Sequence, residues 1–116
     1  MQLPEQSELI RVFVGESDRS GGRPLWEIII EAARKRGLSG ATVLRGIAGF
    51  GATSRIHTTK ILRLSEDLPM VIEIVDATEK IEAFLPELQN LVKGGLITIE
   101  KVRVLAYRPD HAKPNA

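Results

Sequence analysis

The sequence predicts an α+β domain in which two helices cover one face of a four-stranded antiparallel sheet. Apolar residues alternate with strand and helix periods in the order strand, helix, strand, strand, helix, strand over positions 8–107. This order is the split βαβ arrangement of a ferredoxin-like sandwich. The 116 residues, 43% hydrophobic and 27% charged, suit one globular domain with its own core. We therefore expect a lead-in at 1–7, one domain at 8–107 and a tail at 108–116.

The first strand is predicted at 8–15, and it is apolar on both faces. Leu9 and Phe13 share one face, while Ile10, Val12 and Val14 share the other. A sheet with one solvated face normally shows polar residues on that face. Because the two helices cover only one face, we expect another subunit to cover the second, and the sequence predicts a homo-oligomer.

The first helix is predicted to begin at Pro24, after a polar loop at 17–22, and to end at Gly37. Its buried stripe has helical spacing and consists of Leu25, Ile28, Ile29, Ala32 and Ala33. Trp26 and Ile30 widen this apolar arc to roughly 200°, which is more than a surface helix needs. The helix therefore also carries apolar surface beyond what a single sheet face covers.

Two strands are predicted next, at 41–50 and 68–75, with Met70, Ile72 and Ile74 on one face of the second. Between them, 51–67 carries the basic residues Arg55, Lys60 and Arg63. Asp76 with Glu79 is spaced as a capping box for the second helix. The core stripe of that helix consists of Ile81, Phe84, Leu85, Leu88, Leu91 and Val92.

Pro86 lies inside that stripe, so we expect either a kink or two short helices. Gly94 and Gly95 end the helix, and the last strand is predicted at 96–107. Its apolar alternation changes phase after Ile99, which predicts a bulge near Glu100 and Lys101.

Charge and composition argue against several classes of function. The 16 basic residues barely exceed the 15 acidic ones, and only 4% of residues are aromatic, so no nucleic-acid partner is expected. No apolar run approaches the ~20 residues that cross a bilayer, so we expect no membrane insertion. The first residues lack a secretory pattern and the chain has no cysteine. Together these features favour a cytoplasmic protein.

Catalytic and metal-binding patterns are weak. His57 and His111 have no metal-ligand spacing around them, and no serine lies in a G-x-S-x-G elbow, so no catalytic residue and no metal are predicted. Glu73 interrupts an apolar strand. It is interpreted either as a carboxylate on the open sheet face or at a subunit contact, paired with Arg or Lys, or as a ligand contact.

Glycines gather at two places where backbone could approach a ligand. Gly46, Gly49 and Gly51 have neither Walker nor dinucleotide-fingerprint spacing, so they indicate either a sharp bend or close approach to a ligand. Lys93, Gly94 and Gly95 either expose N–H groups to an anion or simply end the helix.

These segments resemble a known family. GLSGATV at 37–43 with GFG at 49–51 is similar to the second strand and T-loop start of the PII nitrogen-regulatory signal proteins. LPMVIEIV at 68–75 looks like the strand that closes this loop, and GGLI at 94–97 occupies the place before strand four. The resemblance covers 8–107, with 51–67 as a T-loop-like segment. It is closest to a PII-like family known as a domain of unknown function.

The resemblance implies a homotrimeric signal-transduction protein with an adenine nucleotide in each cleft between subunits. The loop would then contact a regulated protein, such as a membrane transporter or an enzyme. Position by position, it implies base contacts from Gly40, Ala41, Thr42, Glu73 and Val75. It also implies close approach to the phosphates by Gly49, Phe50, Gly51, Gly94 and Gly95.

The sequence departs from the PII pattern where positive charge is expected. Ala52, Thr53 and Leu96 replace polar or basic residues, and Tyr107 is the only tyrosine, so the modified T-loop tyrosine is missing. Fewer cations suit fewer phosphates, which favours AMP or ADP over ATP. The possible phosphate contacts are Arg55, Lys60, Arg103 and Arg108.

Two alternatives remain open at this point. One is a trimeric interaction module whose loop docks a partner without any ligand. The other is a metal-assisted small-molecule enzyme on the same scaffold, using Glu73 and His57.

Overall fold

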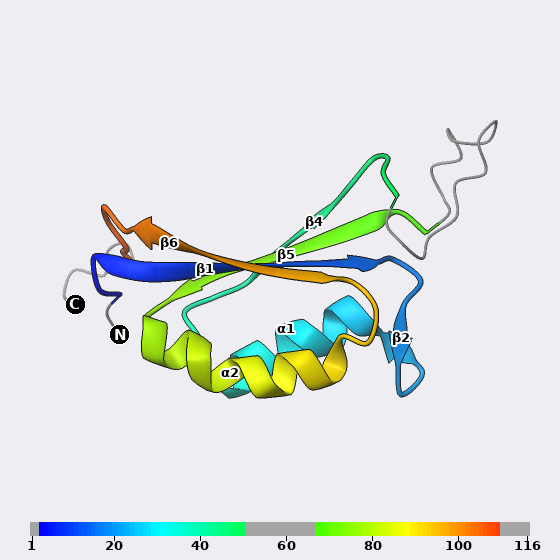
Figure 1. Ribbon diagram of the computed structural model, residues 1–116, viewed down its shortest axis with the longest axis horizontal. Coiled ribbons are helices and arrows are strands. Elements are labelled where there is room, and N and C mark those ends of the chain that lie inside the picture. Colours follow the sequence, from blue (N-terminus) through cyan, green and yellow to red (C-terminus); the bar gives the residue numbers. More distant parts are fainter. Residues whose placement is uncertain (1–2, 51–66, 110–116) are drawn as a thin grey trace.

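The computed structural model describes residues 3–50 and 67–109. The elements follow in the order β1 (Gln6–Gly15), β2 (Arg19–Ser20), β3 (Arg23–Pro24), α1 (Leu25–Lys35), β4 (Thr42–Arg45), β5 (Pro69–Asp76), α2 (Thr78–Leu91) and β6 (Leu96–Arg103). A four-stranded sheet has the order β4-β5-β1-β6, its neighbouring strands are antiparallel, and both helices lie on one face (Figure 1). The predicted ferredoxin-like sandwich is confirmed.

The core lies between the helices and the covered face of the sheet. Its fully buried side chains, 0–1% exposed, come from both layers and are Ile10, Val12, Ile29, Ile72, Ile74, Ile81, Phe84 and Leu88. The predicted alternation is confirmed in β1 and β5, because Ile10 lies opposite Ile74 and Val12 lies opposite Ile72.

Helix α1 keeps close to its predicted bounds because local signals define both ends. Pro24 is its N-cap residue. After the helix, the Gly37 N–H donates to the Arg34 carbonyl and the Leu38 N–H to the Ala33 carbonyl. This paired arrangement is a Schellman motif, which satisfies carbonyls that the helix would leave unpaired.

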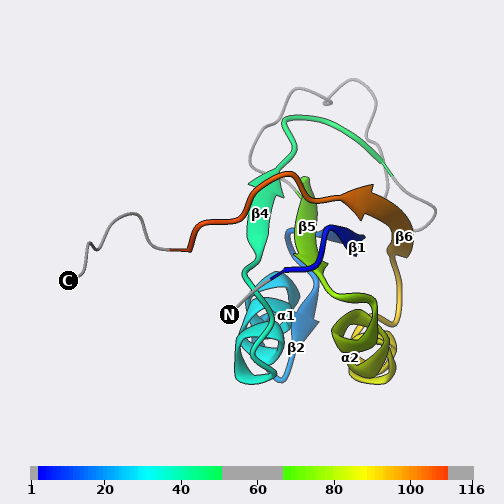
Figure 2. The same cartoon turned by 90° about the vertical axis from the view of Figure 1, so that its left-hand side faces the viewer.

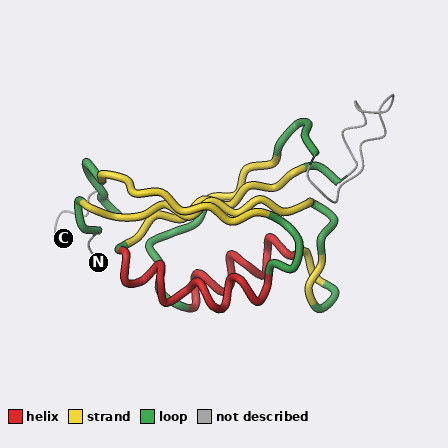
Figure 3. Tube along the Cα trace, viewed as in Figure 1, coloured by secondary structure: helices red, strands yellow, loops and turns green. Residues whose placement is uncertain are grey.

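The loop predicted at 17–22 contains a small hairpin that the sequence interpretation did not include. β2 and β3 pair beside the start of α1 (Figure 3). Gly21 and Gly22 form the turn with φ of 59° and 80°. Two consecutive positive φ values are what a type I′ hairpin turn requires, and a Gly-Gly pair adopts them without steric cost.

The start of α2 and its passage through Pro86 differ from expectation. The N-cap residue is Ala77 and no side chain caps the helix, so the capping box of Asp76 with Glu79 is wrong. The buried Asp76 carboxylate instead accepts N–H groups from Ala77 and Ser39, both at 2.7 Å, and ties β5 to the loop before β4. A single helix spans Pro86, so the alternative of two short helices is also wrong.

The predicted bulge near Glu100 and Lys101 is wrong. Pairing of β6 with β1 runs without interruption from Leu96 opposite Phe13 to Arg103 opposite Gln6. The strand ends there, and 104–109 crosses the open face from β6 toward β4 (Figure 2). Ile97 and Val102 are both half-buried although they lie on opposite faces of the strand, so the apolar alternation changes phase without a bulge.

Strand β4 is shorter than predicted, because the chain turns after Arg45. The Gly46 N–H donates to the Pro69 carbonyl at 2.7 Å. A Cβ on Gly46 would lie 2.7 Å from Pro69 Cγ. Packing against Pro69 therefore shapes this bend.

Within 3–50 and 67–109, no helix is long and apolar enough to span a membrane.

Candidate functional site

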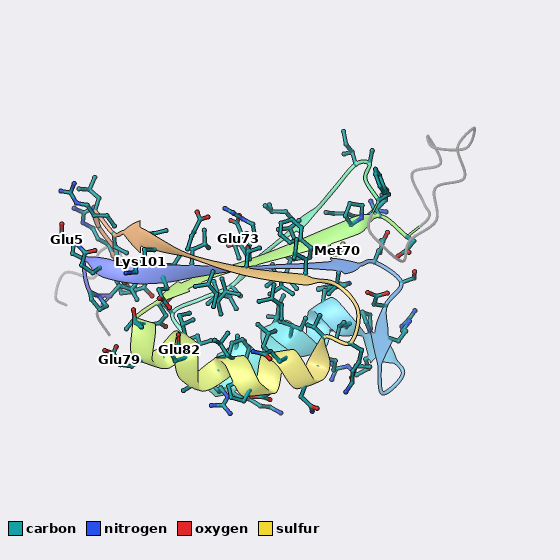
Figure 4. All side chains as sticks on the ribbon, viewed as in Figure 1. Glu5, Met70, Glu73, Glu79, Glu82 and Lys101 are labelled. Atoms are coloured by element: carbon teal, nitrogen blue, oxygen red, sulfur yellow. The ribbon has the colours of Figure 1, made fainter. Side chains whose placement is uncertain are left out.

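The open face of the sheet carries a polar row across its four strands. The register aligns Thr42, Glu73, Arg11 and Thr98 on neighbouring strands. Figure 4 shows Glu73 on the side of the sheet away from the helices. Arg11 Nε donates to Glu73 Oε2 at 2.8 Å, and Arg11 Nη1 lies 3.9 Å from Glu100 Oε1. Glu73 is therefore an ion-paired carboxylate on the open sheet face, one of its two predicted interpretations.

This ion pair is held between apolar side chains. The next row on the same face consists of Leu44, Val71, Phe13 and Leu96. Leu44 and Leu96 end that row and are 49% and 54% exposed. The hydrogen bond to Glu73 raises the pKa of the Arg11 guanidinium above its ordinary value. The open face is thus an apolar surface with a charged centre.

The predicted base contacts lie together at the start of β4, but on two sides of it. Thr42 lies opposite Glu73 on the open face, and Val75 lies two residues further along β5. Gly40 and Ala41 instead line a recess of about 320 Å³ between α1 and the chain entering β4. The other walls of this recess include Ile30, Ala33, Arg34 and Leu38.

The two glycine groups lie at opposite edges of the sheet. Gly49 and Phe50 follow β4, whereas Gly94 and Gly95 precede β6, and β4 and β6 are the two edge strands. Three strand spacings separate these edges, which is about 14 Å. One chain therefore does not bring the two predicted phosphate-binding groups together. Gly51, Arg55, Lys60 and the histidines His57 and His111 lie outside the described residues.

Gly94 and Gly95 differ in their surroundings. A Cβ on Gly95 would lie 2.5 Å from the Phe13 carbonyl oxygen, and the residue has a φ of 153°. A Cβ on Gly94 would meet nothing within 4 Å. The fold itself requires Gly95, while the space around Gly94 is free for another molecule. At the other edge, a Cβ on Gly49 would lie 3.0 Å from Pro69 Cγ, which favours the bend interpretation for that glycine.

The predicted cations differ in how they are engaged. Arg103 Nε donates to Glu5 Oε2 at 2.8 Å. The Arg108 guanidinium has no hydrogen-bond or ion-pair partner among the described residues, and the same holds for Arg34. Sequence reasoning missed Arg34, although it follows Trp26 and Ile30 at four-residue intervals along the edge of the wide apolar arc. That spacing was the available signal.

Metal chemistry finds no support in the described part of the chain. Among residues 3–50 and 67–109, no group of three or more His, Asp or Glu side chains is arranged to hold a metal ion.

Comparisons with known proteins confirm the resemblance to PII-like proteins. The model of the DUF190 family, described as "Uncharacterized ACR", matches residues 7–104. A UPF0166 protein of Aquifex aeolicus is 43% identical over 100 residues, covering 86% of this chain and 94% of that protein.

Solved structures of PII-like proteins share the fold. CPII of Thiomonas intermedia K12, a nitrogen regulatory PII-like protein bound to ADP, AMP and bicarbonate, is similar with a TM-score of 0.62 and 14% identity, covering 85% of this chain and 88% of that one. A putative PII-like signaling protein of Thermus thermophilus gives a TM-score of 0.60 and 18% identity, covering 90% of this chain and 93% of that one. At these identities the likeness establishes the fold.

Proposed function

This chain belongs to the DUF190 family, and from that premise we propose that it is a PII-like regulatory protein that binds AMP or ADP between copies of itself. Binding would alter the segment 51–67, through which the protein contacts a regulated partner such as a membrane transporter or an enzyme. The observation that carries this proposal is the separation of the two predicted half-sites onto opposite edges of one sheet.

The placement of the two half-sites at opposite edges of the sheet favours a closed ring of copies. In such a ring the β4 edge of one copy, with Gly40 to Thr42, lies near the β6 edge of the next, with Gly94 and Gly95. The exposed apolar ends of the open-face row, Leu44 and Leu96, give each copy surface to bury against its neighbours. We propose that the ring is a trimer and that the protein works in the cytoplasm.

The bound state of CPII supports an adenine nucleotide as the ligand of this fold, since that protein holds ADP and AMP. In this chain the predicted phosphate contact Arg103 is already paired with Glu5, and the loop lacks the basic residue of the PII pattern. A smaller supply of free cations favours one or two phosphates over three. AMP and ADP are therefore the proposed ligands.

Arg45, at the end of β4, and Asp67, the last residue of the segment 51–67, are both anchored to the turn that follows β1. Arg45 donates to both carboxylate oxygens of Glu16 at 3.0 and 3.2 Å. Asp67 Oδ1 accepts the Ser17 N–H at 3.1 Å and the Ser17 hydroxyl at 2.7 Å. A ligand that prefers one arrangement of these anchors would shift the population of loop states.

Calorimetric titration of the full chain with AMP, ADP, ATP and GMP tests the proposal, together with mass measurement in solution. We expect one adenine nucleotide per chain, tighter binding of AMP and ADP than of ATP, and a mass three times the 12.8 kDa of the chain. The absence of both heat and thermal shift with every adenine nucleotide would overturn nucleotide binding. A trimer that binds its partner equally with and without nucleotide would favour the ligand-independent module instead.

A further inference from the structure

We infer that Arg34, at the end of α1, holds the phosphate of the nucleotide whose base packs against Gly40 and Ala41. This inference rests on the proposed function, and it assigns the positive charge that the PII pattern lacks in this chain. Two observations carry the inference. Arg34 lines a small recess, and its guanidinium has no hydrogen-bond or ion-pair partner among the described residues.

The recess has the dimensions and chemistry of a small ligand site. Its volume is about 320 Å³, at the lower end of the ~300–1,000 Å³ typical of ligand pockets. Ile30, Ala33, Leu38 and Ala41 contribute apolar surface, and Gly40 contributes wall without a side chain. Flat aromatic rings suit such walls, and Arg34 is the charged residue that lines them.

Arg34 differs from most other arginines of the described chain. A carboxylate pairs with each of Arg11, Arg23, Arg36, Arg45 and Arg103. Glu31, three residues before Arg34 on α1, binds Arg23, and Glu87 on α2 binds Arg36. A phosphate that reaches Arg34 therefore displaces no ion pair of the described residues, and the bidentate fork of the guanidinium suits phosphate oxygens.

The C-terminal segment is tied to the recess wall and carries a second guanidinium that is also unpaired among the described residues. The Tyr107 hydroxyl donates to the carbonyl of Ser39, a residue of the recess wall, at 3.2 Å. Arg108 follows directly, on the part of the chain that crosses from β6 toward β4 (Figure 2). A phosphate monoester carries about −1.5 to −2 charges at pH 7, so one cation in the wall and one on the crossing segment together balance a single phosphate.

Titration of Arg34→Gln with adenosine, AMP and ADP tests the inference, with Lys35→Gln as the matched control. Lys35 is the next residue of α1, carries the same charge and does not line the recess. Loss of a charge-assisted contact predicts that Arg34→Gln weakens AMP and ADP binding about tenfold or more. Adenosine binding, measured by displacement, is expected to change by less than about twofold, as is every affinity of Lys35→Gln. Arg34→Lys is expected to recover part of the loss.

The outcomes separate this inference from the proposed function. Wild-type protein that binds AMP, with Arg34→Gln binding it equally well, overturns the inference and leaves the proposed function standing. Equal losses for adenosine and AMP also overturn it, because Arg34 would then shape the recess and not hold the phosphate. Wild-type protein that binds no adenine nucleotide overturns both. The thermal midpoint of Arg34→Gln should match that of the wild type, since the Arg34 guanidinium has no partner to lose in the described chain.

Discussion

On the helix-covered face, the central side chains of β1 and β5 are Ile10, Val12, Ile72 and Ile74, each 0–1% exposed. At the same level of the open face, Arg11 and Glu73 form an ion pair whose side chains remain 33% and 32% exposed. The covered face is thus completed by the helices of its own chain. The open face combines partly buried and exposed apolar side chains with a charged centre.

This difference separates the face that stabilises the single chain from the face that the proposed assembly would use. Exposed ion pairs contribute little to stability, whereas breaking a buried pair leaves a costly unpaired charge. Arg11 and Glu73 therefore add little to the stability of a single chain, and under the proposed assembly, in which another copy covers them, breaking the pair would cost more. Three predictions test the comparison, in order of decreasing effect.

The same substitution on the two faces should have unequal cost. Val12→Ala removes fully buried methyl groups from the covered face and should lower the free energy of unfolding by about 2–3 kcal/mol. Val71→Ala on the open face, where the valine is half-buried, should cost about 1 kcal/mol or less at low protein concentration. Urea denaturation of each variant, carried out at a low and a high protein concentration, measures both changes in the free energy of unfolding. Equal losses at low concentration would contradict the distinction between the faces.

The neighbouring glycines before β6 should also respond differently. Gly95→Ala forces a Cβ to within 2.5 Å of the Phe13 carbonyl oxygen at positive φ, and should cost about 1–3 kcal/mol. Gly94→Ala has open space and should stay within about 0.5 kcal/mol of the wild type. Thermal melts of the two variants measure the difference. A stable Gly95→Ala protein would show that the close contact with Phe13 relaxes easily.

An exposed ion pair between β3 and α1 gives the baseline for what such a pair contributes away from the open face of the sheet. Arg23 donates to both carboxylate oxygens of Glu31 at 3.1 and 3.2 Å, and these hydrogen bonds lower the pKa of Glu31. A lowered pKa in the folded state stabilises the fold above the ordinary glutamate pKa of about 4.3. That contribution is lost as the pH falls through the lowered folded pKa.

The wild type should therefore melt slightly above Glu31→Gln at pH 7, and the gap should close in acid. Melting curves of both proteins between neutral and acidic pH measure this small effect. A gap of constant size throughout would mean that the charge of Glu31 is not its source.

Much of the fold could be predicted because its signals are local. Pro24 and Gly37 mark the two ends of α1 within the chain segment that forms the helix. The alternation of Met70, Ile72 and Ile74 identifies β5 for the same reason. The predictions of the bulge and the capping box were wrong because Glu100 and Asp76 interact with residues far away in the sequence. Glu100 pairs in register with Leu9, and Asp76 binds the Ser39 N–H.

The candidate site was predicted less completely. The sequence indicated that Gly46, Gly49, Gly94 and Gly95 mattered, but not which of them faces free space. Three of the four pack against other residues, because a Cβ would meet Pro69 at Gly46 and Gly49 and Phe13 at Gly95. Arg34 was missed since nothing in its own segment shows that Glu31 pairs with Arg23 and Glu87 with Arg36.

The order of the two helices and of the four strands in the main sheet, the covered face of β5 and the excess of apolar surface could all be determined from the sequence. Each depends on periodicity within a short segment, because an element with one buried face has apolar residues at the period of a strand or a helix. Tertiary packing alone determined that Arg11 pairs with Glu73 and that Gly94 and Gly95 have different surroundings. It also determined that the recess beside Gly40 has in its wall a guanidinium without a partner among the described residues. These features depend on contacts between residues far apart in the chain, and the period of a single segment carries no information about them.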